Sequence, residues 1–136
     1  MLRAMLTMLA TGIGLPMLAL TDRKDSQPQR IGMVIGIRPD RIAAYEALHA
    51  GSNAGVRDLL TKYHMHNFSI FLKQLEDGNY YLFGYYEYAG KDYKADMEKL
   101  AAEPRNQEWL GITDPMQIPL PGELSWSRMR EVYYNP

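Results

Sequence analysis

Apolar and polar positions follow two different periods along the chain after Arg30. Residues 30–37 form a nearly continuous apolar run rich in β-branched side chains, which predicts a strand. From Ile42 to Tyr63 the apolar positions recur every three or four residues, which predicts a helix. Two glycines within residues 51–55 interrupt this period, so we expect the helix to kink or to divide there.

Two more strands follow and are joined by a tight turn. Residues 67–72 have the alternation of a second strand, with Phe68 and Ile70 on the same face. The Asp-Gly pair at 77–78 is typical of a β-hairpin turn. Residues 80–88 are rich in tyrosine and predict the third strand, so the middle of the chain is expected to be a hairpin.

A second helix and a last strand complete the pattern. Asp92 or a neighbouring residue is expected to cap a helix that runs to about Ala102. The buried side of this helix is expected to carry Tyr93, Met97, Leu100 and Ala101. Residues 104–122 contain Pro and Gly at short intervals and predict turns, and residues 128–134 predict a final strand.

The predicted order of elements is β-α-β-β-α-β. Two split β-α-β units of this kind build an α+β ferredoxin-like sandwich, in which both helices cover one face of a four-stranded antiparallel sheet. Both faces of the strand at residues 80–88 are too apolar for contact with water. We therefore expect a homodimer in which a second copy of the chain covers the open face of the sheet.

Residues 1–29 differ in kind from the rest of the chain. Arg3 precedes an uncharged, mostly apolar run that ends at Leu20, and a polar segment with linker character follows. The run resembles the core of a signal peptide but lacks a clear small-residue cleavage site. It is also short for a stable membrane span, which needs about 20 apolar residues, and it contains Pro16. An export signal and an extension from a misplaced start codon both remain open, and we place the folded domain at residues 30–136.

The composition excludes several classes of function. With 15 Lys and Arg against 16 Asp and Glu, the chain has no positive field that would hold a nucleic acid. The absence of cysteine rules out disulfides, thiolate nucleophiles and cysteine-ligated metal centres. The three histidines, His49, His64 and His66, lack the spacing of a dedicated metal site, so we expect no bound metal.

Tyr45 and His49 are the most suggestive pair for chemistry. They stand four residues apart on the first predicted helix and so project from one face. An imidazole exchanges protons near neutral pH, and a phenol beside it can orient a substrate or relay the proton. The same spacing also suits a half-buried pair that packs against the sheet, so both interpretations stay open.

Aromatic residues later in the chain allow two interpretations as well. Trp109 and Trp126 suit a flat wall on which a sugar stacks its C–H face, and they equally suit packing in a core or interface. Glu87 lies among aromatic residues and is expected either to pair with Arg30 or Arg128 or to act as a catalytic carboxylate. For His64 and His66 we expect structural roles at the end of the first helix.

Several short motifs occur in a fixed order within residues 30–136. They are Arg30, Arg38-Pro39-Asp40, Tyr45-x-x-x-His49, His66–Leu72, Leu82-Phe83 with Glu87, Trp109, and Glu131–Tyr134. In this order and spacing they resemble the L-rhamnose mutarotase family. The resemblance covers nearly the whole predicted domain and does not extend to residues 1–29.

This resemblance implies a dimeric α+β barrel of ferredoxin-like subunits that works without a metal or an organic cofactor. It implies an isomerase that interconverts the α and β anomers of a 6-deoxyhexose, with L-rhamnose as the first choice, by general acid/base ring opening and reclosure. His49 falls on the family's proton donor. Tyr45 falls on the sugar-binding tyrosine four residues before it.

Two further sugar-binding positions of the family differ here. The binding tyrosine after His-Asn is replaced by Phe68, which keeps the ring and loses the hydroxyl. The family's paired tryptophans correspond to Trp109 and Leu110, so one stacking surface and one N–H donor are lost. L-Fucose, or another deoxy or methylated sugar, is therefore an alternative substrate.

Three further points stay open at this stage. The general base is Glu87, Asp114 or water. Two other functions fit the expected fold: a monooxygenase or isomerase from another family of dimeric α+β barrels, and a sugar-binding protein without catalysis. The resemblance implies a cytoplasmic protein, whereas a working signal in residues 1–20 would place it in the periplasm or outside the cell.

Overall fold

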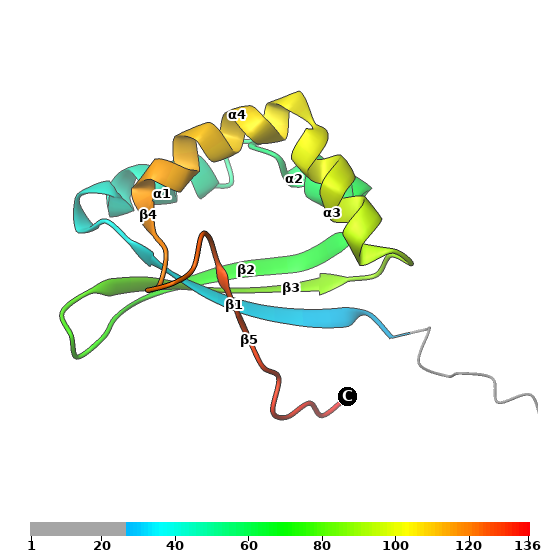
Figure 1. Cartoon of the computed structure of the whole chain (residues 1–136). Helices are drawn as coiled ribbons and strands as arrows, with labels where there is room; N and C mark the ends of the chain where they lie inside the picture. Colours follow the sequence, from blue (N-terminus) through cyan, green and yellow to red (C-terminus); the bar gives the residue numbers. More distant parts are fainter. Residues whose placement is uncertain (1–26) are drawn as a thin grey trace, which may run out of the picture.

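All the α-helices of the computed structural model, which describes residues 27–136, lie over one face of a twisted antiparallel sheet (Figure 1). The strands are β1 (Gln29–Ile37), β2 (Met65–Gln74), β3 (Tyr80–Tyr88), β4 (Gln117–Ile118) and β5 (Ser127–Met129). Their order in the sheet is β2-β3-β1-β4, and β5 also pairs with β1. This is the predicted α+β arrangement of the ferredoxin-like type. The signal-like run of residues 4–20 lies outside the described residues.

The central strand β1 pairs with β3 along its whole length, from Gln29 opposite Tyr88 to Ile37 opposite Tyr80. The hairpin between β2 and β3 turns at Gly78, whose φ of 79° suits glycine, as the Asp-Gly pair predicts. The other edge of β1 is shared by the short strands β4 and β5. The fourth strand of the sandwich is therefore built from two short pieces.

The final strand is shorter than the sequence predicts. Only Ser127–Met129 pairs with β1, and residues 130–134 have no regular secondary structure. Side chains hold this tail instead: the Arg30 guanidinium binds Glu131 with Nε–Oε2 at 2.7 Å and covers the ring of Tyr134 at 3.2 Å. The predicted strand over residues 128–134 is confirmed at Arg128 and Met129 and is wrong for residues 130–134, where side-chain contacts replace backbone pairing.

The first predicted helix is divided as expected. It comprises a short 3-10 turn, Pro39–Arg41, followed by α1 (Ile42–His49) and, after the glycine-containing connection, α2 (Arg57–Lys62).

The helix α3 (Tyr93–Ala102) begins where predicted, since the Asp92 side chain accepts a hydrogen bond from the Ala95 N–H at 3.0 Å. Ala101 is exposed and not buried, which corrects the predicted inner face of α3.

A helix replaces the turns predicted after residue 104. The helix α4 (Pro104–Thr113) begins at Pro104, where the fixed φ of proline suits a first turn, and a 3-10 turn, Asp114–Met116, follows it. The fully buried positions of α4 are Asn106 and Thr113, which are polar. An apolar period does not reveal this helix, because polar side chains occupy its two most buried positions.

Strand β2 carries an irregularity that places its side chains. The register with β3 shifts between His66 and Ser69, and Asn67 has a φ of 49°. This bulge puts Met65 and Phe68 on the same inner face despite their odd spacing, and both line the space under the helices. The predicted face with Phe68 and Ile70 therefore points toward the helices.

The core consists of two apolar clusters. One joins Ile31, Val56, Leu59, Tyr63, Met65, Tyr86, Tyr88 and Leu100, and the other joins Ile35, Ile37, Tyr45 and Leu82. Both clusters contribute to the walls of a cavity between the sheet and the helices. On the opposite face of the sheet Phe71 is 65% exposed. Within residues 27–136, no helix has the length and apolar character needed to cross a membrane.

Candidate active site

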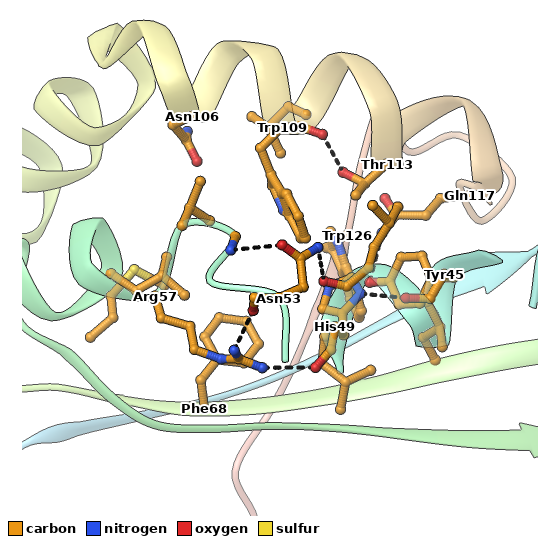
Figure 2. Close-up of a pocket in the computed structure, with 18 of the residues that line it drawn as sticks. Tyr45, His49, Asn53, Arg57, Phe68, Asn106, Trp109, Thr113, Gln117 and Trp126 are labelled. Atoms are coloured by element: carbon orange, nitrogen blue, oxygen red, sulfur yellow. Dashed lines mark hydrogen bonds between the residues drawn. The ribbon is translucent and has the colours of Figure 1, made fainter. Parts of the chain in front are cut away.

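A cavity of about 810 Å³ lies between the inner face of the sheet and the helices. Side chains from α1, α4, β2 and the connection between α1 and α2 converge on it (Figure 2). All five residues proposed from the sequence as the site line this one cavity: Tyr45, His49, Phe68, Trp109 and Leu110. Pockets that bury most of a small ligand measure about 300–1,000 Å³, so the cavity has the size of a ligand site.

The rings of Tyr45 and His49 stack on each other, with their centroids 4.1 Å apart. Nδ1 of His49 lies 2.7 Å from the backbone carbonyl oxygen of Tyr45. A carbonyl oxygen only accepts, so Nδ1 carries the proton of this hydrogen bond. Nε2 is then the nitrogen that can exchange a proton with a ligand.

The hydroxyl of Tyr45 lies in a buried, polar corner of the cavity. It accepts a hydrogen bond from the Gln117 amide at 3.3 Å, and the residue is only 5% exposed. Burial, and to a smaller extent the charge of Asp114, raise the pKa of Tyr45 above its ordinary value. Tyr45 therefore stays a neutral phenol at physiological pH and keeps its own proton for donation to a ligand oxygen.

Trp109 extends from α4 toward His49, with the two rings edge to face at 5.1 Å. Its indole packs closely on Gly55: a Cβ at that glycine would lie 3.2 Å from both Cη2 and Cζ3. Gly55 also has a φ of 53°, in the left-handed region that favours glycine. The small residue thus lets the connection after α1 approach the indole.

Arg57 and Asn53 hold the end of α1 in place and were not found by sequence reasoning. The Arg57 guanidinium donates to the carbonyl oxygens of His49 at 2.8 Å, Ala50 at 3.1 Å, and Asn53. The Asn53 amide donates to the Leu48 carbonyl at 2.8 Å. These bonds satisfy carbonyls that a helix end leaves free. A basic residue eight positions after His49 is no distinctive pattern in a sequence.

Of the two carboxylates considered as general base, only Asp114 lines the cavity. Burial raises the pKa of Asp114 above its ordinary value. Glu87 lies on the opposite face of β3 and accepts hydrogen bonds from Asn67 and the Tyr85 hydroxyl, both at 2.9 Å. Those bonds lower the pKa of Glu87. The expected ion pair of Glu87 with Arg30 is replaced by the pair of Arg30 with Glu131.

The aromatic and apolar walls complete the cavity. Phe68 stacks on Tyr86 with centroids 5.0 Å apart and faces the helices from β2. Trp126, which precedes β5, lines the cavity together with Trp109. Leu110 lies at its rim and is 39% exposed. Two tryptophans and a phenylalanine thus provide surfaces for the C–H face of a ligand.

Of the remaining histidines, His64 lies outside the cavity and His66 lines it. Nε2 of His64 is 4.0 Å from the Asp96 carboxylate, and His66 lines the cavity from an exposed position on β2. Among residues 27–136 no three His, Asp or Glu side chains come together in a group that would hold a metal ion. Asn106, which lines the cavity from α4, is a further polar residue that sequence reasoning missed.

Comparisons with known proteins agree with this architecture. A family model described as L-rhamnose mutarotase matches residues 30–135. The crystal structure of an L-rhamnose mutarotase from Formosa agariphila superposes with a TM-score of 0.60 at 18% sequence identity, and the match covers 79% of this chain and 99% of that one. No curated protein matches the chain.

Proposed function

The chain belongs to the L-rhamnose mutarotase family, a family of carbohydrate isomerases, and we propose that it interconverts the α and β anomers of a 6-deoxyhexose, with L-rhamnose as the expected substrate. The observation that carries this proposal is the stacked pair of Tyr45 and His49 on the cavity wall. The Tyr45 carbonyl orients the imidazole. Nε2 of His49 and the hydroxyl of Tyr45 are then available to form hydrogen bonds with a sugar.

The reaction needs one acid and one base. A base takes the proton of the anomeric hydroxyl, the bond between C1 and the ring oxygen breaks, and His49, which enters the step protonated on both ring nitrogens, gives its Nε2 proton to that ring oxygen. Rotation about C1–C2 in the open aldehyde and reclosure on the other face give the second anomer, and the two protons return. A positioned acid or base contributes about 10²- to 10⁴-fold each.

Asp114 is the base that the geometry supports best, since it lines the cavity near Tyr45. Tyr45 acts as a neutral hydrogen-bond donor that orients the sugar oxygen between acid and base. Trp109 and Trp126 offer stacking surfaces for the sugar. The choice between L-rhamnose and L-fucose depends on polar contacts, because Phe68 and Leu110 supply only apolar surface.

We also propose that the working form is a homodimer through the open face of the sheet. Phe71 is 65% exposed on this face, and the C-terminal tail presents Val132 at 82% and Tyr133 at 79% exposure. Apolar surface of this kind is typical of a protein interface. Sedimentation velocity at micromolar concentration tests the dimer, and Phe71→Lys should convert it to a monomer.

We place the protein in the cytoplasm, where free monosaccharides enter catabolism, unless residues 1–20 act as an export signal. The two cases differ in the N-terminus of the mature protein. Edman sequencing of the native protein therefore decides between them: a mature chain that starts near Thr21 would indicate export, and an intact N-terminus would indicate retention.

The central experiment is proton exchange spectroscopy on the anomers of L-rhamnose and L-fucose with the full chain. We expect accelerated exchange between the anomers that His49→Ala abolishes. His64→Asn is the matched control, because His64 does not line the cavity and asparagine tolerates its φ of 64°. Sugar binding without acceleration would indicate a binding protein. A folded protein with no affinity for either sugar would support a different function on the same fold.

A further inference from the structure

Asn106 is a polar residue of the cavity wall whose amide makes no hydrogen bond to any residue among 27–136 and is open to the cavity, since the Ser127 hydroxyl is the one buried polar side-chain atom left without a partner in that part of the chain. The residue is only 5% exposed and lines the cavity from the first turns of α4 (Figure 2). The buried polar neighbour on the same helix, Thr113, donates its hydroxyl to the Trp109 carbonyl at 3.2 Å. The same helix therefore satisfies one buried polar side chain internally and leaves the other free toward the cavity.

The amide of Asn106 is available to a ligand. Apolar side chains of Val56, Leu60 and Leu100 also line the cavity and offer the amide no hydrogen bond. An amide that faces a cavity can exchange its hydrogen bonds to water for hydrogen bonds to the hydroxyls of a ligand. Asn106 is therefore a candidate for ligand recognition.

The position of Asn106 indicates which part of a ligand it meets. It precedes Trp109 by three residues, so the two side chains project from the same face of α4. In Figure 2, Asn106 and the Tyr45 hydroxyl lie on opposite sides of the indole of Trp109. A pyranose that stacks on this indole with its anomeric carbon at His49 turns the opposite side of its ring, C3 and C4, toward Asn106.

We propose that Asn106 is a specificity-determining residue that binds the vicinal hydroxyls at C3 and C4 of the sugar, an inference that rests on the proposed mutarotase function. The amide is suited to a vicinal diol, because Oδ1 accepts from one hydroxyl while Nδ2 donates to the other. Phe68 has no hydroxyl and Leu110 no N–H, so Asn106 supplies polar recognition that these two residues do not.

The test measures dissociation constants of the full-length protein for L-rhamnose and for its 3-deoxy and 4-deoxy analogues. We expect the wild-type protein to bind each deoxy analogue about 5- to 10-fold more weakly, since one net hydrogen bond is lost. Asn106→Leu removes both hydrogen bonds, so it should weaken the binding of L-rhamnose by about 25- to 100-fold and bind all three sugars with nearly equal affinity. Glu108→Leu is the matched control on the exposed side of α4 and should keep the wild-type pattern.

A second measurement separates ligand binding from a structural role. Without sugar, Asn106→Leu should melt at about the same temperature as the wild type, because the change removes no hydrogen bond to another residue among 27–136. A lower melting temperature with unchanged discrimination among the sugars would overturn the proposal. Equal affinity of the wild type for L-rhamnose and both analogues would overturn it as well, whether or not the variant folds.

The outcomes also distinguish this inference from the proposed function. If the wild type accelerates anomer exchange but does not discriminate against the deoxy analogues, the Asn106 contact is refuted and the mutarotase proposal stands. If the wild type discriminates without accelerating exchange, and Asn106→Leu loses the discrimination, the contact stands and catalysis is refuted. If no sugar binds, both are refuted.

Discussion

Arg57 donates a hydrogen bond through Nη2 to the backbone carbonyl oxygen of His49, 2.8 Å away. The same guanidinium contacts the carbonyls of Ala50 and Asn53, so it fixes the residue at the end of α1 and the connection that follows. The imidazole orientation depends on this backbone, because Nδ1 of His49 is bonded to the Tyr45 carbonyl one turn earlier. Arg57 is thus a positioning residue for the proposed acid.

Arg57→Gln should lower kcat for anomer exchange several-fold with little change in KM, since it releases the backbone at His49 and removes no surface that stacks on the sugar. The loss of the three carbonyl contacts should lower the free energy of unfolding by about 1–2 kcal/mol. Arg57→Lys should recover part of both effects. Exchange spectroscopy at several sugar concentrations and chemical denaturation measure them.

The matched control is Arg105→Gln on α4, whose guanidinium forms an exposed ion pair with Asp58. A surface pair of this type contributes about 0–1 kcal/mol, and the change should leave kcat as it is. Equal effects of the two variants on kcat would show that charge, and not the contact with the end of α1, explains the result for Arg57.

Gly55→Ala should be destabilising and should disturb Trp109. The glycine has a φ of 53°, and a methyl group there would lie 3.2 Å from two indole carbons. Backbone strain and the close contact therefore both destabilise the folded state of the variant. We expect a loss of about 1–3 kcal/mol in the free energy of unfolding and a changed tryptophan fluorescence.

Gly51→Ala is the control within the same connection, because nothing lies within 4 Å of a Cβ at Gly51 and its φ is not in the left-handed region. Alanine there should be neutral or should stabilise by about 0.4–1 kcal/mol through the unfolded state. If both glycines tolerate alanine equally, the close approach of Gly55 to Trp109 does not constrain the site.

Part of this fold follows from local sequence patterns. The apolar run of β1, the Asp-Gly turn at Gly78 and the Asp92 cap of α3 each depend on a few neighbouring residues, and the structure has all three. The helix α4 does not follow in this way. Its two fully buried positions, Asn106 and Thr113, are polar, and one of them is the residue for which we infer ligand recognition.

The candidate site is only partly visible in the sequence for a related reason. The spacing of Tyr45 and His49 identifies them as neighbours on one helix face, and the stacked rings agree with that spacing. Gln117 and Arg57 reach the pair from other segments, and Gln117 lies 72 residues from Tyr45. Contacts of this kind depend on how the elements pack against one another. The spacing of apolar residues within one segment does not predict them.

Asp114→Asn should reduce anomer exchange by about 10²-fold if Asp114 is the general base. In the wild-type protein the rate should fall with decreasing pH as the Asp114 carboxylate becomes protonated. Because burial raises the pKa of Asp114, this fall should occur at a higher pH than an exposed aspartate would produce. Exchange rates measured between pH 3 and 8 test both statements.

Glu87→Gln serves as the comparison, because Glu87 lies on the opposite face of the sheet, bonded to Asn67 and Tyr85. Its exchange rate and pH profile should match those of the wild type. If the exchange rate of Asp114→Asn still falls at low pH as it does in the wild type, water, and not this carboxylate, takes the proton from the anomeric hydroxyl.

Tyr88 should make the fold sensitive to alkaline pH. Burial, followed by the hydrogen bond from its hydroxyl to Asp96 at 2.6 Å, raises the pKa of Tyr88 to about 12. The folded state therefore favours the neutral phenol: its stabilisation is complete below the unfolded pKa of about 10 and is lost as the pH rises toward 12. One group of this kind changes the unfolding free energy by at most about 1.4 kcal/mol per pH unit.

Denaturant unfolding at pH 9, 10 and 11 should show this loss in the wild-type protein, and Tyr88→Phe should reduce its slope. Burial also raises the pKa of Tyr86, whose hydroxyl is 2.7 Å from that of Tyr93, so some alkaline sensitivity should remain in the variant. Tyr133→Phe is the control at a residue that is 79% exposed and should keep the full slope. An identical slope in wild type and Tyr88→Phe would mean that Tyr88 ionises in the folded state as readily as in the unfolded chain.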